Sequence, residues 1–484
     1  MRYLTKLISG LGIVMLGAML IAANANAQAD SKIVKLVGNG SATVTRGGQT
    51  LPATEGMAIA VGDVINAGAG VDVFYQAYAG ALSKLMANGH VKVEAIQGDT
   101  ALLDLTAGGG GRLTAQIDPN KGHKFAVRTP KGVAAAKGTV YTIEVSNQTY
   151  TVVTFNGGVA VLAGNFSDAA STLQSAYDTS GANLNVVGTN AVVLTPGKAV
   201  VDNTTTTGFT VTDGSNPTAA AAITSAAQIA VTAIAQTASQ NIGGQGQTAS
   251  NELAQVVGTV VQAVPSSIGA VAATAAAAAP DQAAKVVKAA VDNAPAGQAA
   301  NVATQATQGA TQGVVQANGG VVNNTVTQQV TDITKNASDS AAAKDPTNAG
   351  TIATQVSQAG AAGATQGITA SGGNVNNGTA ATDLAAAASS GATAGAISGS
   401  KATGTAAQTI ADNASTGAVQ GATNSGATTV NSGTVSQGAQ TGAASSGATV
   451  NTPTVTPPTP VVQPTTPTTP VTPIDPGLNV SPAG

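Results

Sequence analysis

Bulky aromatic side chains are confined to the first part of this 484-residue chain. All five phenylalanines and all six tyrosines lie at or before Phe209, and the chain contains no tryptophan. Large rigid rings supply much of the surface that a conventional core buries. The sequence therefore predicts a well-filled core only in roughly the first 40% of the chain. The rest of the chain is expected to lack a core of this kind.

The composition argues against several classes of function. Charged residues make up 8% of the chain, against about 25% in a typical globular domain. The formal net charge is −3 and no stretch is rich in Lys or Arg, so electrostatic binding of nucleic acid is not expected. The absence of cysteine excludes disulfides, thiolate metal sites and a lipoprotein anchor.

The N-terminus has the pattern of an export signal. Arg2 and Lys6 precede an uncharged apolar run over residues 7–23, and Ala25-Asn26-Ala27 gives the small-x-small pattern before Gln28. We predict a signal peptide over residues 1–27. The alternative, an uncleaved anchor, is disfavoured because the run is shorter than the ~20 residues that span a bilayer. No later segment is expected to span a membrane, so the mature chain is predicted in the periplasm, at the cell surface or outside the cell.

Residues 29–203 have the pattern of an all-β domain with many short antiparallel strands. Ser41–Arg46 and Val91–Ala95 alternate between apolar and other residues, and Asn88-Gly89 is a hairpin signal because both residues tolerate positive φ. Within Lys124–Val145 we expect two strands, one with Phe125 and Val127 and one over Val140–Val145. Residues 165–185 are rich in Ser, Asp and Asn and are predicted to be a surface insertion.

The order of these elements resembles the FecR periplasmic domain. The resemblance covers about residues 33–201, and its most specific feature is a Thr-Pro pair, a short spacer, and then a basic residue followed by Gly-Thr and an alternating strand. The last turns of the family are matched by Gly157-Gly158 and Pro196-Gly197. The family-motif residues, which we take as structural or as docking positions, are Gly62, Asp63, Asn88, Gly89, Thr129, Pro130, Lys137, Gly138 and Thr139.

The resemblance implies a fold and a compartment. Well-known members of the family are membrane-spanning regulators of iron uptake, with a cytoplasmic segment that acts on a sigma factor. Here the predicted signal peptide leads straight into the β-domain, so the regulatory pathway is not implied. The basic residue before Gly-Thr is more often Arg in the family, whereas this chain has Lys137, a point charge in place of a planar fork.

No pattern of catalytic or metal-binding residues stands out. His90 and His123 are the two histidines, and a zinc site would need three or four ligands. Gly108–Gly111 before Arg112 lacks the ending of a phosphate loop. Asp63 and Asp99 both follow Gly, which indicates repeated turns rather than an acid–base pair. We therefore predict no enzyme activity, no cofactor and no metal.

After a predicted linker, residues 204–218, the chain becomes rich in alanine. Within residues 219–300 we expect short helices, beginning with one over Ala219–Gln240. Pro265, Pro280 and Pro295 recur every 15 residues, and proline suits the first turn of a helix while ending the helix before it. Apolar residues in 250–264 fall on a single helical stripe.

A longer repeat follows in residues 301–450. Gly309-Ala310-Thr311-Gln312-Gly313 recurs at Gly363–Gly367 and, as Gly-Ala-Val-Gln-Gly, at Gly417–Gly421. Glycines four apart leave a flat strip on which backbones can approach closely, which suggests self-association through these helices. Because Gly, Asn and Thr oppose helix formation, we predict that this region is partly helical or disordered. The Pro/Thr-rich tail, 451–484, is predicted to be polyproline II or disordered.

Three hypotheses of function follow. The first is an exported, non-enzymatic binding or scaffold module of the envelope or cell surface, whose partner is an unidentified envelope protein or polysaccharide. The second is a periplasmic sensor of FecR-type transmembrane signalling, which depends on the resemblance alone. The third is an enzyme of polysaccharide metabolism. It is supported only by the predicted β-domain and would need paired carboxylates in a cleft.

Overall fold

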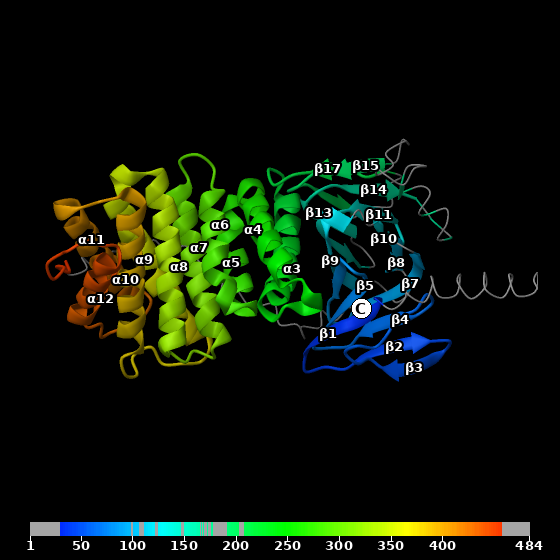
Figure 1. Cartoon of the computed structure of the whole chain (residues 1–484), viewed down its shortest axis with the longest axis horizontal. Coiled ribbons are helices and arrows are strands. Elements are labelled where there is room, and N and C mark those ends of the chain that lie inside the picture. Colours follow the sequence, from blue (N-terminus) through cyan, green and yellow to red (C-terminus); the bar gives the residue numbers. More distant parts are fainter. Residues whose placement is uncertain are drawn as a thin grey trace, which may run out of the picture. The chain divides into compact units, whose positions relative to one another are not determined.

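The structure is a computed structural model that describes residues 30–97, 100–105, 111–121, 124–146, 150–164, 166, 168, 172, 176–177, 191–202 and 208–456. The chain divides into two compact units that join in sequence between Asp213 and Gly214. We call them the β unit and the helical unit and describe each by itself (Figure 1). The predicted signal peptide lies outside the described residues.

The β unit contains two sheets. Sheet A has eight antiparallel strands in the order β1-β5-β6-β9-β12-β13-β16-β17, and sheet B has nine in the order β15-β14-β11-β10-β8-β7-β4-β2-β3. In sheet B, β10 runs parallel to β8, and every other pairing of the described strands is antiparallel. The strands of sheet A are β1 Lys32–Gly38, β5 Val71–Tyr78, β6 Ala81–Leu85, β9 Gly111–Ile117, β12 Val140–Val145, β13 Tyr150–Asn156, β16 Ala199–Asp202 and β17 Val211–Thr212. Those of sheet B are β2 Ala42–Arg46, β3 Gln49–Pro52, β4 Val64–Ala67, β7 His90–Gln97, β8 Thr100–Asp104, β10 Lys124–Thr129, β11 Gly132–Lys137, β14 Val159–Ala163 and β15 Ala191–Leu194.

One apolar core joins the two sheets. Tyr75 and Tyr141 of sheet A and Phe125 and Val127 of sheet B belong to the same cluster of buried side chains. Alternate residues of each strand contribute to this cluster because successive side chains point to opposite faces of a sheet. The prediction of a β-rich domain of many short strands is therefore confirmed at the level of a sandwich-like, mixed arrangement. Strand β17 falls within the segment predicted as a linker, 204–218.

The stretch Lys124–Val145 forms three strands, not the two that the sequence predicts. Between β10 and β12 lies β11, whose residues Val133–Ala136 pair with β10 on one side and β14 on the other. Alanine has a low intrinsic strand preference, so the run of three alanines did not indicate a strand. Its position between two strands of sheet B overrides that preference.

The predicted insertion after Ala163 is described only in part. Tyr177 is buried, and its hydroxyl donates to the carbonyl oxygen of Ala136 at 2.9 Å. Its ring packs with Val133 and Ala135, in a cluster separate from the main core. This side chain therefore covers the second face of sheet B and is not a surface residue.

The helical unit consists of two rows of helices (Figure 1). Odd-numbered helices contact the next odd-numbered helix, even-numbered helices contact the next even-numbered one, and consecutive helices join the rows. The odd row is α3 Pro217–Gln240, α5 Ile268–Ala278, α7 Ala299–Ala317, α9 Ala349–Ala370 and α11 Gly404–Asn424. The even row is α4 Gly246–Ala263, α6 Ala283–Asp292, α8 Asn324–Lys344, α10 Ala380–Ser400 and α12 Ser432–Ser445. Pro265, Pro280 and Pro346 begin the 3-10 turns that precede α5, α6 and α9.

Glycines spaced by four residues lie where neighbouring helices of one row meet. A Cβ atom on Gly309 of α7 would lie 1.9 Å from the carbonyl oxygen of Gly269 of α5. A Cβ on Gly363 of α9 would lie 2.1 Å from the oxygen of Gln308, and one on Gly417 of α11 would lie 2.3 Å from that of Thr354. The repeated motif therefore provides close backbone contact within this chain, and its glycines are already covered.

The helices continue through Ser445, within the region predicted to be partly helical or disordered. One expectation for the later part of the chain is wrong. A filled core exists without aromatic rings, since Val314, Ile352, Val356 and Ala361 are fully or almost fully buried. Small side chains leave few voids between closely approaching helices, and this dense packing adds many weak van der Waals contacts. The tail prediction from residue 457 onward lies outside the described residues.

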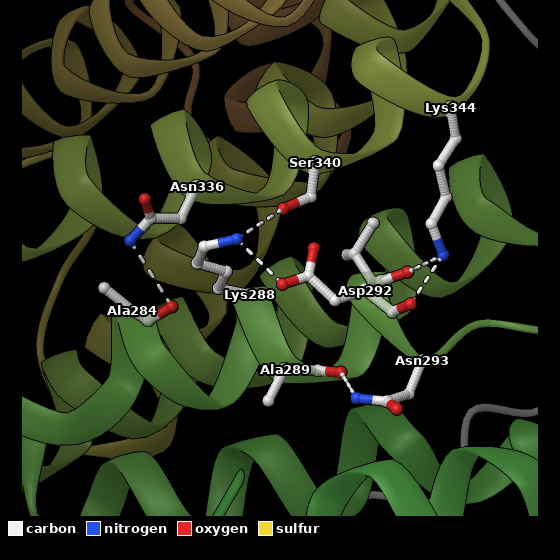
Figure 2. A network of polar contacts seen from close by, with 9 residues as sticks. Ala284, Lys288, Ala289, Asp292, Asn293, Asn336, Ser340 and Lys344 are labelled. Atoms are coloured by element: carbon white, nitrogen blue, oxygen red, sulfur yellow. Dashed lines mark hydrogen bonds and ion pairs between the residues drawn. The ribbon is translucent and has the colours of Figure 1, made fainter.

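Polar contacts hold α6 against α8 in the even row (Figure 2). The Lys344 ammonium donates to the carbonyl oxygens of Val291 and Asp292, both at 2.7 Å. These carbonyls lie at the C-terminal end of α6, where a cation is favoured. Lys288 contacts Asp292 at 2.7 Å and Ser340 at 3.5 Å.

Among the described residues, α3 is one helix that is long and apolar enough to cross a membrane by length and composition. This differs from the expectation that no segment after the N-terminus approaches a span. In the structure α3 contacts α4 and α5, and more than half of its most apolar window is buried.

Replacing Gly363 by Ala should destabilise the helical unit. The added methyl group meets the backbone oxygen of Gln308, and such overpacking costs about 1–3 kcal/mol. Gly350→Ala in the same helix is the matched control, because its nearest neighbour is the flexible side chain of Asn413 and alanine favours the helix by roughly 0.5–1 kcal/mol. Thermal unfolding followed by circular dichroism at 222 nm distinguishes the two variants. Equal melting temperatures would contradict the packing role of Gly363.

Alkaline pH should unfold the β unit. Burial raises the pKa of the Tyr141 hydroxyl well above its ordinary value, which is about 10. Folded protein therefore keeps a proton that the unfolded chain loses, so the stability from this group is complete below about pH 10 and falls as the pH rises further. Tyrosine absorbance at 295 nm should rise together with loss of the sheet signal.

Tyr141→Phe tests the same point. Within the described part of the chain the Tyr141 hydroxyl has no hydrogen-bond partner, so the variant should keep its stability at pH 7 to within about 1 kcal/mol. Its stability should then fall less steeply above pH 10. An unchanged slope would contradict the assignment.

Candidate functional site

The Lys137-Gly138-Thr139 motif lies where the chain passes from one sheet to the other. Strand β11 ends at Lys137 in sheet B, and β12 begins at Val140 in sheet A. Gly138 has φ of 64°, and a Cβ atom there would lie 2.5 Å from Cα of Pro119. The Thr139 hydroxyl donates to the carbonyl oxygen of Gly158 at 3.1 Å. Glycine and threonine are thus required here by the turn between the sheets.

The Gly157-Gly158 turn fits against this crossing. A Cβ atom on Gly157 would lie 2.6 Å from both the Gly138 oxygen and the Thr139 hydroxyl. Gly157 also has a positive φ of 72°, which side chains rarely tolerate. Two motifs that are about 20 residues apart in the sequence are therefore parts of one corner.

Thr129-Pro130 closes the hairpin between β10 and β11. Thr129 pairs with Gly132, which leaves Pro130 and Lys131 as the two turn residues. The Thr129 hydroxyl donates to the Gly132 carbonyl at 3.0 Å, and the N–H of Gly132 lies 3.2 Å from the same hydroxyl. Asn88-Gly89 turns the chain between β6 and β7, with Asn88 at φ of 63° as its sequence predicts.

Asp63 in the Gly62-Asp63 motif forms an ion pair with Arg46. Its two carboxylate oxygens accept from Nε of Arg46 at 2.7 Å and from the terminal guanidinium nitrogen at 2.6 Å. The N–H of Ala60 donates to the same carboxylate at 2.8 Å. Asp63 is 1% exposed, and Gly62 adopts the left-handed φ of 91° that the turn needs. The carboxylate therefore ties strand β2 to the turn before β4.

Sequence reasoning missed a charged cluster on the outer face of sheet B. Arg128 of β10 contacts Asp104 of β8 at 2.7 Å and Glu94 of β7 at 3.2 Å, and Lys92 contacts Glu94 at 2.8 Å. The Arg128 guanidinium also donates to the carbonyl oxygen of Phe166 at 3.2 Å. The charges balance, and the cluster holds three strands and the described part of the insertion together. Alternating charges at 92 and 94 were the signal that could have indicated it.

The described residues contain no group of three or more His, Cys, Asp or Glu that could hold a metal ion. His90 on β7 contacts the side-chain oxygen of Asn66 through Nδ1 at 2.7 Å. His123, Asp99 and Gly108–Gly110 lie outside the described residues.

An open groove in the helical unit is lined mainly by polar, uncharged residues. Its volume is about 670 Å³, and it lies between α7 and α9, with the end of α11 at its border. The small residues Gly297, Ala300, Ala359 and Ala362 form part of its wall. Its polar lining is dominated by primary amides, which are Asn301, Gln308, Gln355, Gln358, Gln366 and Asn424.

The chemistry of the groove is uniform. Gln308 donates through Nε2 to the side-chain oxygen of Gln366 at 3.2 Å, across the two helices. The Thr304 hydroxyl donates to the Ala300 carbonyl within its own helix at 2.8 Å. Every polar lining side chain is an amide or a hydroxyl, so each can donate and accept hydrogen bonds and none titrates near neutral pH. The sequence did not indicate this site, because its residues come from separate repeats.

The helical unit also binds an extended piece of its own chain. Residues 450–456, which we call the extended segment, lie along α11 and α12. The N–H groups of Asn451, Thr454 and Thr456 donate to side chains of Gln408 (2.7 Å), Asp412 (2.8 Å) and Thr416 (3.2 Å). These three acceptors are four residues apart on α11. From α12, Ser436 donates to the Pro453 carbonyl at 2.8 Å.

Comparisons with known proteins give a weak likeness only. No family model and no curated protein matches this chain. Two crystal structures of a candidate anti-sigma factor from Parabacteroides distasonis, at 1.65 and 2.50 Å resolution, are similar to it. Each match has 14% identity and a TM-score of 0.23, covers 31% of this chain, and spans 58% of the length of that protein.

Asp63→Ala should destabilise the β unit. The change removes both hydrogen bonds from Arg46 to the carboxylate, which leaves Arg46 the Ala58 carbonyl, and it removes the partner of the Ala60 N–H, at a cost of about 2 kcal/mol. Lys35→Ala is the control, because its ion pair with Glu55 is well exposed and such pairs contribute roughly 0–1 kcal/mol. Thermal unfolding monitored by the sheet signal measures both. If Asp63→Ala melted with the wild type, the motif would have a role other than this ion pair.

Proposed function

We propose that this protein is an exported, non-enzymatic module of the bacterial envelope or cell surface that acts by binding and scaffolding. The observation that carries the proposal is the amide-lined groove between α7 and α9. A groove with many neutral donors and acceptors is suited to hold a polar, uncharged ligand. General acid–base catalysis needs groups that exchange a proton near the working pH, and the groove lining offers none.

Two further observations support the same reading. The family-motif residues of the β unit are engaged in turns, in the crossing between the sheets and in the Arg46–Asp63 pair. They therefore support a scaffold role for the β unit. Export is supported by the charged start, apolar run and small-residue site of residues 1–27.

Retention in the cell envelope tests this proposal. Wild-type protein should fractionate with the envelope. The double variant Gln308→Lys with Gln366→Lys should be retained about tenfold less, because two charges in the uncharged groove should weaken the free energy of binding by more than about 1.4 kcal/mol. Gln328→Lys, at an exposed position on α8, is the matched control and should be retained like the wild type.

Wild-type protein found wholly in the growth medium would contradict the envelope role. Loss of retention in the Gln328→Lys control as well would show that charge alone, and not the groove, causes the effect. Circular dichroism of each variant verifies that the helices are intact.

The second candidate function is a sensor in FecR-type signalling. It is favoured by the motif order that ends in Lys137-Gly138-Thr139. Deleting the gene should then change transcription in response to iron or envelope stress. Unchanged transcription under both conditions would remove this candidate and leave the binding role untouched.

A further inference from the structure

The extended segment shows how this helical unit holds a polypeptide. Gln408 accepts from the N–H of Asn451 at 2.7 Å, while its own amide lies 3.5 Å from the carbonyl oxygen of the same residue. The next contacts are one and two helical turns further along α11, at Asp412 and Thr416. A polar side chain in each successive turn thus contacts the backbone of an extended strand.

The groove is lined by part of the corresponding stripes of α9 and α7. The repeated motif advances by 54 residues, from Gly309 to Gly363 and from Gly363 to Gly417. By that shift Gln408, Asp412 and Thr416 of α11 correspond to Thr354, Gln358 and Ala362 of α9, of which the last two line the groove. A further shift gives Ala300, Thr304 and Gln308 of α7, all of which line it. The groove therefore presents polar side chains at three of the positions that correspond to the binding stripe of α11, namely Gln358, Thr304 and Gln308.

Position and length favour one occupant. The extended segment runs from Gln408 toward Thr416, in the direction of Asn424, and Asn424 lines the groove. The remaining part of α11 spans about 12 Å at 1.5 Å per residue. Residues 457–473 follow directly, and as a polyproline strand they would reach about 50 Å. That segment contains no charged residue and is composed mainly of Pro and Thr.

The chemistry of such a strand matches the lining. Each proline lacks an N–H group, so a Pro-rich strand presents more acceptors than donors. In polyproline II the backbone makes no internal hydrogen bonds, and its carbonyls need outside donors. Glutamine and asparagine amides supply two donors each. A charged ligand, in contrast, would find no opposite charge among the lining side chains.

We propose that the groove binds an extended, uncharged, Pro/Thr-rich polypeptide strand, and that residues 457–473 of the same chain are its resident occupant. The inference rests on the proposed binding function and names the ligand class of that groove. Any external partner of the same chemistry must then displace the chain's own segment before it can bind.

Photo-cross-linking of the full chain tests the proposal. Gln355, an exposed residue of the groove lining, is replaced by p-benzoylphenylalanine, and the control places the same group at Gln328 on α8. Irradiation should link position 355 to residues 457–473 within one monomer. The Gln308→Ala and Gln366→Ala pair should lower the yield about tenfold, as expected for the loss of two hydrogen bonds.

A second arm does not depend on the folding of any groove variant. A synthetic peptide of residues 457–473, added at millimolar concentration to match the effective concentration of a short tether, should suppress the intramolecular link. A link of dimer mass would overturn the assignment to the chain's own segment. Equal yields from positions 355 and 328, or no effect of the peptide, would overturn the groove as the site. Envelope retention is measured separately, so failure of the proposed function gives a different result.

Discussion

Close approach of helix backbones is the constraint on which the helical unit depends. Side chains of Ala, Val and Thr are short, so two helices gain dispersion contacts only if their axes come close. Glycines at Gly309, Gly363 and Gly417 lie against neighbouring carbonyl oxygens, where any Cβ atom would collide. The spacing of α7, α9 and α11 follows from this contact. The width of the groove between α7 and α9 follows in turn.

The repeats could be recognised in the sequence, but the packed core that they form could not be predicted from it. Period and glycine spacing predicted close helix contacts, and the contacts lie where those glycines are. A filled core beyond Phe209 was not predicted, because the chain has no aromatic rings there. Short side chains nevertheless reach a high packing density when helix backbones meet. In the β unit, strand β11 was missed because three alanines carry little strand preference by themselves.

The sites show a similar division. Asn88 was assigned to a turn because its residue type tolerates positive φ, and it has one. The motif glycines Gly62 and Gly138 also have positive φ. The Arg46–Asp63 pair joins residues 17 apart, and no local pattern indicates such a contact. The groove could not be predicted either, because Gln308, Gln366 and Asn424 share no local sequence pattern and come together only when the helices pack. A sequence therefore predicts local backbone geometry better than it predicts tertiary contacts.

The small-residue core of the helical unit also affects its thermal behaviour. Unfolding raises the heat capacity of a protein mainly through newly hydrated apolar surface. Methyl and isopropyl groups such as those of Ala361 and Val314 expose less of that surface per residue than the rings of the β unit. The helical unit should therefore have a low heat-capacity increment and a broad, shallow dependence of stability on temperature, so that cooling weakens it little.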